Sequence, residues 1–200
     1  MSKLKVTNLS CQKGYNLLFE NLSFEINSGE VLKISGPNGS GKTSLLRLLA
    51  GLSSFDSGSI NYDAFNLNSE EYKLDFLYLG HLTALSQQLS CIENLKYNSL
   101  LGNNKLGLDF SSALKKVGLE KFENELVGTL SAGQKKRIAL SLLFVTQSKV
   151  WLLDEPFSAL DSKAINIIEQ RIEEHCNSGG ICILTTHQEC NIKNLKEISL

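Results

Sequence analysis

One eight-residue segment, 36–43, constrains the fold of this chain more than any other part of the sequence. It matches the pattern G-x-x-x-x-G-K-[ST] in full, with the residues Gly36, Pro37, Asn38, Gly39, Ser40, Gly41, Lys42 and Thr43. An apolar run at 31–35 precedes it, and leucines at helical spacing follow it as far as Leu52. Glycines in such a loop let backbone N–H groups point inward at phosphate oxygens, and the start of the next helix adds a favourable dipole. The segment therefore predicts an α/β fold with a phosphate-binding loop between a strand and a helix.

Polar residues at the end of the loop indicate which phosphates it would hold. Lys42 would reach the β- and γ-phosphates of a nucleoside triphosphate, and Thr43 would offer its hydroxyl to Mg²⁺. We also expect Ser44 to contact the nucleotide. The alternative is an ordinary glycine-rich turn, which we disfavour because the strand and helix patterns on either side match as well.

An apolar run that ends in two carboxylates supplies the acidic partner of this loop. The run covers 150–153 and is followed by Asp154 and Glu155. A buried strand would deliver Asp154 to the C-terminal edge of a sheet, where its carboxylate can hold Mg²⁺ directly or through water. Glu155 points differently and is placed to polarise an attacking water. Two acids after a strand are usually a solvated strand end, but the upstream loop and the turn forced by Pro156 favour the catalytic interpretation.

Three further features follow in order along the chain. Residues 130–134 read Leu-Ser-Ala-Gly-Gln, residues 158–161 read Ser-Ala-Leu-Asp, and an isolated His187 follows a later apolar run. Together with the two motifs above, this order resembles the ATPase subunit of ATP-binding-cassette (ABC) machines, and the resemblance covers the whole chain. It implies ATP binding and hydrolysis coupled to movement of a partner.

The resemblance implies roles for these residues at the interface of a dimer. The segment 131–134 would reach the γ-phosphate bound by the opposite subunit, through the residues Ser131, Ala132, Gly133 and Gln134. The family usually has L-S-G-G-Q, so Ala132 is a departure that adds one methyl group where close backbone approach matters. Asp161 resembles the residue that communicates between the two sites, and it equally suits the N-cap of the next helix. His187 resembles the histidine that contacts the γ-phosphate, although a lone histidine after a buried strand is more often structural.

Two positions fit the family pattern poorly. An ABC subunit places an aromatic residue that stacks on adenine close to residue 13, and Tyr15 is the only aromatic residue nearby. It lies slightly off the expected register. The family usually has a glutamine that touches Mg²⁺ and the attacking water after the strand predicted at 76–79, and this chain has His81 instead. Gln87 and Gln88 come too late in the sequence to replace it.

The overall pattern predicts one ABC-type domain that covers residues 1–200. Residues 1–81 begin with an antiparallel β part, and alternating strands and helices return at 146–200. These two stretches would form a nucleotide-binding core around a mostly parallel sheet that is covered on both faces. Between them, residues 82–145 read as helical and would form an inserted lobe.

Capping signals set the limits of the later helices. Ser131 opens a predicted capping box with Gln134, and that helix is predicted to run through Val145. Asp161 is predicted to cap a helix that has isoleucines on one face. This helix is predicted to end at Gly179 and Gly180. The last predicted strand covers 181–185.

Charge and hydropathy narrow the classes of partner. The net charge of −1 provides no basic surface for nucleic acid. No apolar stretch approaches the ~18 residues that cross a bilayer, and the N-terminus lacks the apolar core of a signal peptide. Five scattered cysteines without a C-x-x-C pair support neither a zinc site nor a disulfide framework. We therefore expect a cytoplasmic protein that meets a membrane only through protein partners.

Several details resemble one ABC subfamily, the haem-exporter ATPase of cytochrome c maturation. They are the short length and the residues at 78–81 (Tyr-Leu-Gly-His), 131–134 and 153–161. This resemblance implies a peripheral subunit on the cytoplasmic face of the inner membrane, which pairs with integral membrane ABC subunits and forms an ATP-dependent homodimer. In that system ATP hydrolysis is tied to delivering or releasing haem. No C-x-x-C-H haem-attachment motif occurs in this chain.

The sequence leaves two alternative functions open. One is the ATPase subunit of another small ABC transporter, of the lipoprotein or cell-division type. The other is a non-transport ABC ATPase that acts on nucleic acid, which the neutral charge and the single short cassette disfavour.

Overall fold

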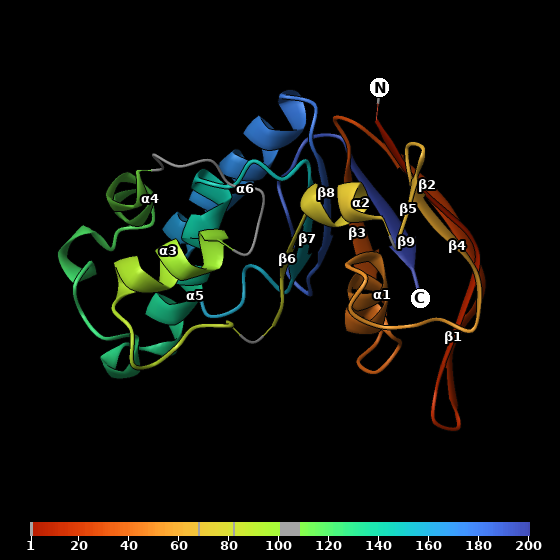
Figure 1. Cartoon of the computed structure of the whole chain (residues 1–200), viewed down its shortest axis with the longest axis horizontal. Coiled ribbons are helices and arrows are strands. Elements are labelled where there is room, and N and C mark those ends of the chain that lie inside the picture. Colours follow the sequence, from red (N-terminus) through yellow and green to blue (C-terminus); the bar gives the residue numbers. More distant parts are fainter. Residues whose placement is uncertain (1, 68, 82, 101–108) are drawn as a thin grey trace.

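The computed structural model describes residues 2–67, 69–81, 83–100 and 109–200. Two sheets, with helices between and beside them, form a layered α/β molecule (Figure 1). The lobe expected at 82–145 includes Leu82 and residues 101–108, which lie outside the described residues.

An antiparallel sheet forms one end of the molecule (Figure 1). Its strands are β1 (Lys3–Lys13), β2 (Asn16–Asn27), β4 (Ser57–Tyr62) and β5 (Phe65–Asn66), in the order β2-β1-β4-β5. Leu4 and Val6 of β1 are buried and the residue between them is exposed, so one face of the sheet packs on the core and the other meets solvent. Lys13 pairs with Asn16 at the end of the β1–β2 hairpin, which leaves Tyr15 in the turn.

A parallel sheet lies in the middle of the molecule. Its strands are β3 (Val31–Ser35), β6 (Phe76–Leu79), β7 (Val150–Asp154), β8 (Ile181–Thr185) and β9 (Leu195–Ser199), in the order β6-β7-β8-β3-β9. Every residue of β7 and β8 is buried, as expected for strands that are covered on both faces. Because the strands are parallel, the residues that follow β3, β7 and β8 meet at the same edge of the sheet.

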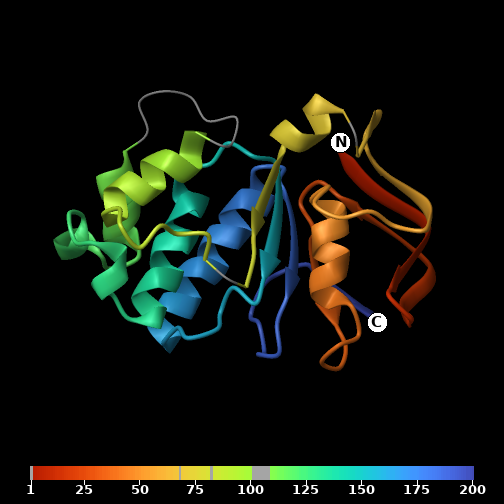
Figure 2. The ribbon, with the colours of Figure 1, turned by 60° about the horizontal axis from the view of Figure 1, so that its bottom comes forward.

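Helices cover both faces of the parallel sheet. Helix α1 (Lys42–Leu49) lies between the two sheets, and α6 (Ser162–Asn177) lies on the opposite face (Figures 1 and 2). Beyond α6 lie α3 (Cys91–Leu100), α4 (Phe110–Lys116) and α5 (Ala132–Ser141), together with 3₁₀ turns at Glu120–Phe122, Val127–Thr129 and Leu142–Phe144. A short helix, α2 (Glu70–Leu74), leads into β6.

Alternate residues of the central strands enter two separate hydrophobic cores. Val150 and Leu152 of β7 pack with α1 and the antiparallel sheet, whereas Trp151 and Leu153 face the helical side. The leucines of α1 at 45, 46, 48 and 49 are at most 1% exposed. Burying each of these side chains contributes about 2 kcal/mol, so the loop at 36–43 is held between a firmly packed strand and a firmly packed helix.

Two expectations from the sequence differ from the structure. The helix predicted from Ser131 through Val145 ends as an α-helix at Ser141 and continues as a 3₁₀ turn. The buried hydroxyl of Ser141 donates to the carbonyl oxygen of Ile138 at 2.6 Å, which competes with the regular helical hydrogen bonds. In addition, β9 pairs with β3, although the sequence predicts no strand after residue 185. The residues of β9 are partly exposed and lack the continuous apolar run from which a strand is predicted.

An aromatic stack joins β7 to α6. The rings of Trp151 and His175 lie 3.7 Å apart and are nearly parallel, at 4°. His175 is buried, and its Nε2 lies 3.1 Å from the carbonyl oxygen of Lys149. Burial lowers the pKa of His175 to about 4, and the charge of Arg171 acts in the same direction. A side chain at Gly180 would collide with the imidazole, so the glycine makes room for the stack.

Candidate functional site

The predicted phosphate loop spans the turn between β3 and α1. Gly41 has a φ of +103°, a left-handed conformation that glycine adopts without strain. A Cβ at this position would also press against side chains of β2 at 3.1 and 3.3 Å. Lys42 begins α1, and its ammonium donates to the carbonyl oxygens of Gly36 at 2.7 Å and Pro37 at 2.9 Å. The loop therefore wraps around its own lysine, which is 9% exposed.

Asp154 ends β7 and lies against the start of α1. Its carboxylate accepts hydrogen bonds from Thr43 Oγ1, at 2.9 and 3.1 Å, and from Thr185 Oγ1 at 2.8 Å. The carboxylate and the threonine hydroxyls present oxygen atoms, the kind of ligand that Mg²⁺ prefers. In the described ranges no three His, Cys, Asp or Glu side chains are grouped so that they could hold a metal ion. The residues here that could hold such an ion are Thr43, with its hydroxyl, and Asp154, with its carboxylate.

Glu155 follows with an unusual backbone conformation. Its φ is +49°, in the left-handed region, which costs a non-glycine residue about 1 kcal/mol. Its N–H donates to the carbonyl oxygen and the Oγ1 of Thr185, at 3.2 and 3.0 Å. Its carboxylate Oε1 lies 3.5 Å from Nε2 of His187. The tight turn after β7 thus aims this carboxylate at the residue that follows β8.

These groups meet in one pocket of about 360 Å³. Most of the residues predicted from the sequence line it: Asn38, Gly39, Gly41, Lys42, Thr43, Ser44, His81, Asp154, Glu155 and His187. Gly36, Pro37 and Ser40 belong to the same loop but do not line the pocket. Lys13 from β1 and Leu18 from β2 complete the wall on the side of the hairpin.

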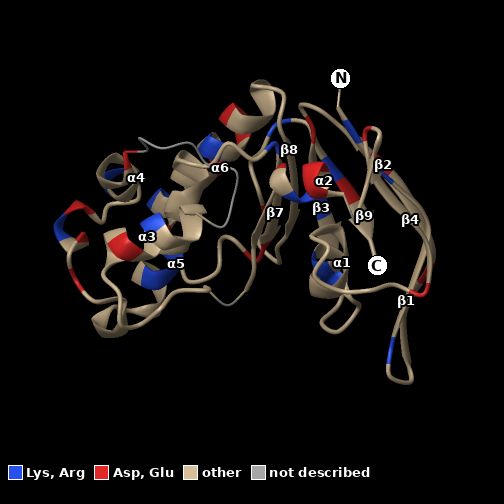
Figure 3. Ribbon diagram, viewed as in Figure 1, with Lys and Arg blue, Asp and Glu red and all other residues tan. Residues whose placement is uncertain are grey.

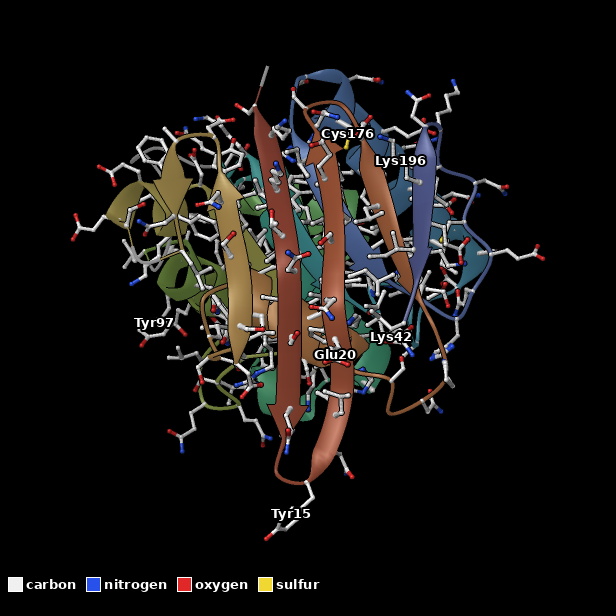
Figure 4. All side chains as sticks on the ribbon, turned by 90° about the vertical axis from the view of Figure 1, so that its right-hand side faces the viewer. Tyr15, Glu20, Lys42, Tyr97, Cys176 and Lys196 are labelled. Carbon is white, nitrogen blue, oxygen red and sulfur yellow. The ribbon has the colours of Figure 1, made fainter. Side chains whose placement is uncertain are left out.

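Tyr15 does not line this pocket. Its side chain is fully exposed, and Figure 4 shows the ring at the tip of the β1–β2 hairpin, where it extends away from the body of the protein. The preceding Gly14 has a φ of +62° in the tight turn that puts Tyr15 at the tip. Lys13 and Leu18 occupy the side of the pocket where a stacking residue is expected. The stacking role predicted for Tyr15 is untested, and it would require the hairpin to close over the pocket.

The segment 131–134 lies on a different surface. Ser131 Oγ accepts from the N–H of Gln134 at 3.2 Å, and Gln134 Oε1 accepts from the N–H of Ser131 at 2.9 Å, so the predicted capping box is confirmed. Together with Gly133 and Asp161, these residues line a pocket of about 450 Å³. It shares no lining residue with the first pocket across the described part of the chain.

The structure explains why an alanine is accommodated in this segment. Ala132 is exposed at the start of α5. By contrast, a Cβ at Gly133 would lie 2.8 Å from the carbonyl oxygen of Ala159. Contacts within the chain therefore require glycine at position 133 and not at position 132.

Asp161 has the capping role that the sequence predicts. Its Oδ1 accepts from the N–H of Ala164 at 2.8 Å, and its Oδ2 accepts from the guanidinium of Arg137. The hydrogen bond from Ala164, together with the charge of Arg137, lowers the pKa of Asp161. Asp161 thus stays ionised where it joins the start of α6 to α5.

Two residues near the carboxylates were not expected from the sequence. Lys136 of α5 is 6% exposed, and its ammonium donates to the carbonyl oxygen of Asp154 at 3.4 Å. Burial lowers the pKa of Lys136, while the charges of Asp154 and Glu155 oppose that shift. A run of three basic residues at 135–137 is typical of a solvated helix face, so the sequence does not indicate that Lys136 is buried. The position of Thr185, at the end of a buried strand, was the available clue to its contact with Asp154.

Basic and acidic residues are interspersed over the described part of the molecule, on the helical side as well as around the sheets (Figure 3). Within the described ranges, no helix combines the length and the apolar character that crossing a bilayer requires.

Comparison with known proteins decides the family. A family model described as ABC transporter matches residues 19–158 of this chain. The chain belongs to the ABC transporter family. Its curated relatives include the Cytochrome c biogenesis ATP-binding export protein CcmA of Shewanella frigidimarina, 44% identical over 94% of this chain and 88% of the relative. The protein of the same name from Haemophilus influenzae is 42% identical over 99% of this chain and 95% of the relative.

Solved structures share the fold of this ABC protein. A putative ABC transporter ATP-binding protein from Pyrococcus furiosus superposes with a TM-score of 0.85, at 24% identity, over 99% of this chain and 97% of that one. A dimeric post-hydrolysis state of an ATP-binding cassette, bound to ADP and Pi, gives a TM-score of 0.80 at 24% identity, over 92% and 88% of the two chains.

As an ABC ATPase, the chain binds and hydrolyses ATP. The predicted fold class is confirmed: a parallel central sheet, an N-terminal antiparallel part and helices on the far side. Its relatives align along nearly the whole chain, so the resemblance inferred from separate motifs also includes the segments between those motifs.

Proposed function

We propose that this chain is the ATP-hydrolysing subunit of an exporter for cytochrome c biogenesis, in which hydrolysis is tied to the delivery or release of haem. One observation carries the proposal: relatives named for cytochrome c biogenesis are 40–45% identical over at least 94% of this chain. The pocket at the edge of the parallel sheet brings together a lysine, a threonine and two carboxylates that would serve the ATPase reaction.

Phosphate binding would fall to the loop 36–44. The Lys42 ammonium, which is held by two loop carbonyls, sits where it can transfer its hydrogen bonds to β- and γ-phosphate oxygens. Backbone N–H groups at the start of α1 add a favourable dipole. Asn38, Gly39 and Ser44 line the same wall.

The donor set at Thr43 and Asp154 fits Mg²⁺. A hydroxyl and a carboxylate already lie within hydrogen-bond distance of each other, and both are oxygen ligands. The ion would neutralise charge on the phosphates when bound. In the chain itself, Thr185 holds the Asp154 carboxylate in place through a 2.8 Å hydrogen bond.

Water activation would fall to Glu155. Its carboxylate lines the pocket next to Asp154 and is held there by a constrained backbone. It would accept a proton from the attacking water as the water oxygen bonds to the γ-phosphorus and the bond from that phosphorus to the β–γ bridging oxygen breaks, so that ADP leaves. His187, 3.5 Å away, would contact the γ-phosphate and hold the carboxylate in position. His81 lines the same pocket and would take the place of the family's usual glutamine.

The complete site would need a second chain. A separate pocket, which shares no lining residue with the pocket at the phosphate loop of the same chain, is lined by Ser131, Gly133, Gln134 and Asp161. We therefore propose a head-to-tail homodimer in which these residues reach the ATP of the opposite subunit. The core would comprise 1–81 and 146–200, and the helical lobe about 82–145.

The proposed setting is peripheral, on the cytoplasmic face of the inner membrane, with integral membrane ABC subunits as partners. A net charge of −1 supports the expectation that nucleic acid is not a partner.

A complementation experiment tests the proposal. The gene is deleted in its own host, and c-type cytochromes are measured by haem staining with and without the wild-type chain or Lys42→Ala. Loss of haem-stained cytochromes that only the wild type restores supports the proposal. Normal cytochromes together with a defect in lipoprotein release or in division would assign the chain to another small ABC transporter.

A further inference from the structure

Lys136 is the buried member of a basic run on α5. It lies two residues after Gln134 and is 6% exposed. Its neighbours Lys135 and Arg137 are more exposed. The helix thus turns one lysine of the run into the protein interior, towards the parallel sheet.

The Lys136 ammonium contacts the peptide bond that joins Asp154 to Glu155. It donates to the carbonyl oxygen of Asp154 at 3.4 Å. The N–H at the other end of the same peptide donates to Thr185, at 3.0 and 3.2 Å. This peptide is therefore held at both polar ends, on one side by α5 and on the other by β8.

The burial of the charged Lys136 ammonium at this position requires an explanation. Burying an ammonium costs several kcal/mol unless hydrogen bonds or opposite charges compensate. Among the ion pairs of the described residues none involves Lys136, so its ammonium is compensated by the hydrogen bond to the carbonyl oxygen and by the more distant charges of Asp154 and Glu155. A methionine would fill similar space without that cost. The lysine thus places a charged donor on one particular carbonyl group.

The backbone of Glu155 explains what that donor can do. Glutamate disfavours the left-handed conformation that residue 155 adopts at φ +49°. Rotation of the preceding peptide would relieve the strain and loosen the backbone constraint that fixes the direction of the Glu155 side chain. Contacts on both ends of the peptide oppose this rotation.

We propose that Lys136 is a positioning residue for Glu155, and that it links the position of the helix carrying Ser131–Gln134 to the carboxylate that activates water. The inference rests on the proposed role of Glu155. Helix α5 begins at the segment proposed to contact the opposite ATP, so a shift of α5 would move the Lys136 ammonium and release the peptide.

Steady-state kinetics of the full chain, purified with the membrane subunits that accompany it, tests the proposal. Lys136→Met should lower kcat by about tenfold to a hundredfold, as is typical when a supporting contact is lost, and leave KM for ATP within about twofold. The matched control is Lys135→Met on the same helix, which should keep the wild-type kcat. If Lys136→Met does not fold, Lys136→Gln is judged by the same criteria.

A double-mutant cycle separates positioning from general stabilisation. In the Glu155→Gln background, Lys136→Met should change the residual rate less than about twofold, because its effect acts through Glu155. An equal loss in both backgrounds, or a wild-type kcat for Lys136→Met, would overturn the inference. A wild-type chain that neither binds nor hydrolyses ATP would instead overturn the proposed catalytic roles.

Discussion

Nε2 of His187 lies 3.5 Å from Oε1 of Glu155, although one residue follows β8 and the other follows β7. The two strands pair in parallel, with Asp154 opposite Thr185, so their following residues emerge at one edge. The carboxylate proposed to accept a proton from water and the imidazole proposed to contact phosphate therefore form one unit. A change in either side chain should alter the position of the other.

Replacing Glu155 by glutamine should stall the reaction after ATP binding. The amide keeps the shape but loses the basicity, so we expect the rate to fall by about a hundredfold or more and an ATP-bound dimer to accumulate. Size-exclusion chromatography with light scattering, in Mg-free ATP, measures the dimer. Glu20→Gln on the outer sheet is the control. A wild-type rate would remove Glu155 from catalysis, and a variant that binds ATP tightly as a monomer would show that the dimer requires the membrane subunits.

Removing the loop lysine should abolish hydrolysis and weaken nucleotide binding. Lys42→Ala deletes the ammonium that the loop carbonyls hold in position for the phosphates. Titration with a fluorescent ATP analogue and a phosphate-release assay measure the two effects, with the exposed Lys5→Ala as control. Unchanged turnover would count against the assignment of the loop.

The role of His81 can be tested by restoring the family's usual residue. His81 lines the ATP pocket. If its imidazole replaces the glutamine by hydrogen bonding, His81→Gln should keep the ATPase rate within about threefold, and His81→Ala should lower the rate by about tenfold. A phosphate-release assay on the three proteins measures this. A wild-type rate for His81→Ala would make His81 a structural joint only.

The hairpin offers a direct test of adenine stacking. Because the Tyr15 ring is fully exposed at the tip, Tyr15→Ala should change ATP affinity less than about twofold, well under the loss expected for a stacked aromatic ring. Lys13→Ala, which alters the pocket wall, should have the larger effect. Binding titrations of both variants decide between the two positions. A larger loss for Tyr15→Ala would mean that the hairpin closes over the base.

Protonation of His175 should make the protein less stable in acid. The folded-state pKa is lowered to about 4 by burial, so between that value and the ordinary pKa of histidine the unfolded chain binds the extra proton. Stability should therefore decrease as the pH falls from about 6.5 to 4, by on the order of 3 kcal/mol in total. Urea unfolding followed by circular dichroism measures this slope. His175→Phe keeps a flat ring against Trp151 and should reduce the slope; an unchanged slope would exclude His175 as its source.

The sequence was informative where function imposes a local pattern. The loop at 36–43, the apolar strand before Asp154 and the capping box at Ser131 depend on neighbouring residues, and the structure contains each of these elements. Their proposed roles toward ATP rest on chemistry that the fold makes feasible.

Long-range contacts could not be read in the same way. Lys136 looks like part of a solvated helix face, and only the packing of α5 against β7 buries it. Strand β9 has a mixed pattern because it lies at a sheet edge, where pairing with β3 compensates for weak hydrophobicity. The exposed position of Tyr15 depends on the conformation of the hairpin turn, which the spacing of aromatic residues does not reveal.

The stack of Trp151 on His175 also has a practical consequence. Trp151 is the one tryptophan in the sequence, and its strand ends at Asp154. Light absorbed selectively by indole is therefore emitted from a single known place, in the strand that ends at the ATP site. The unlabelled protein carries its own fluorescent reporter, and any nucleotide-driven shift of β7 against α6 should change the surroundings of that ring and therefore its emission.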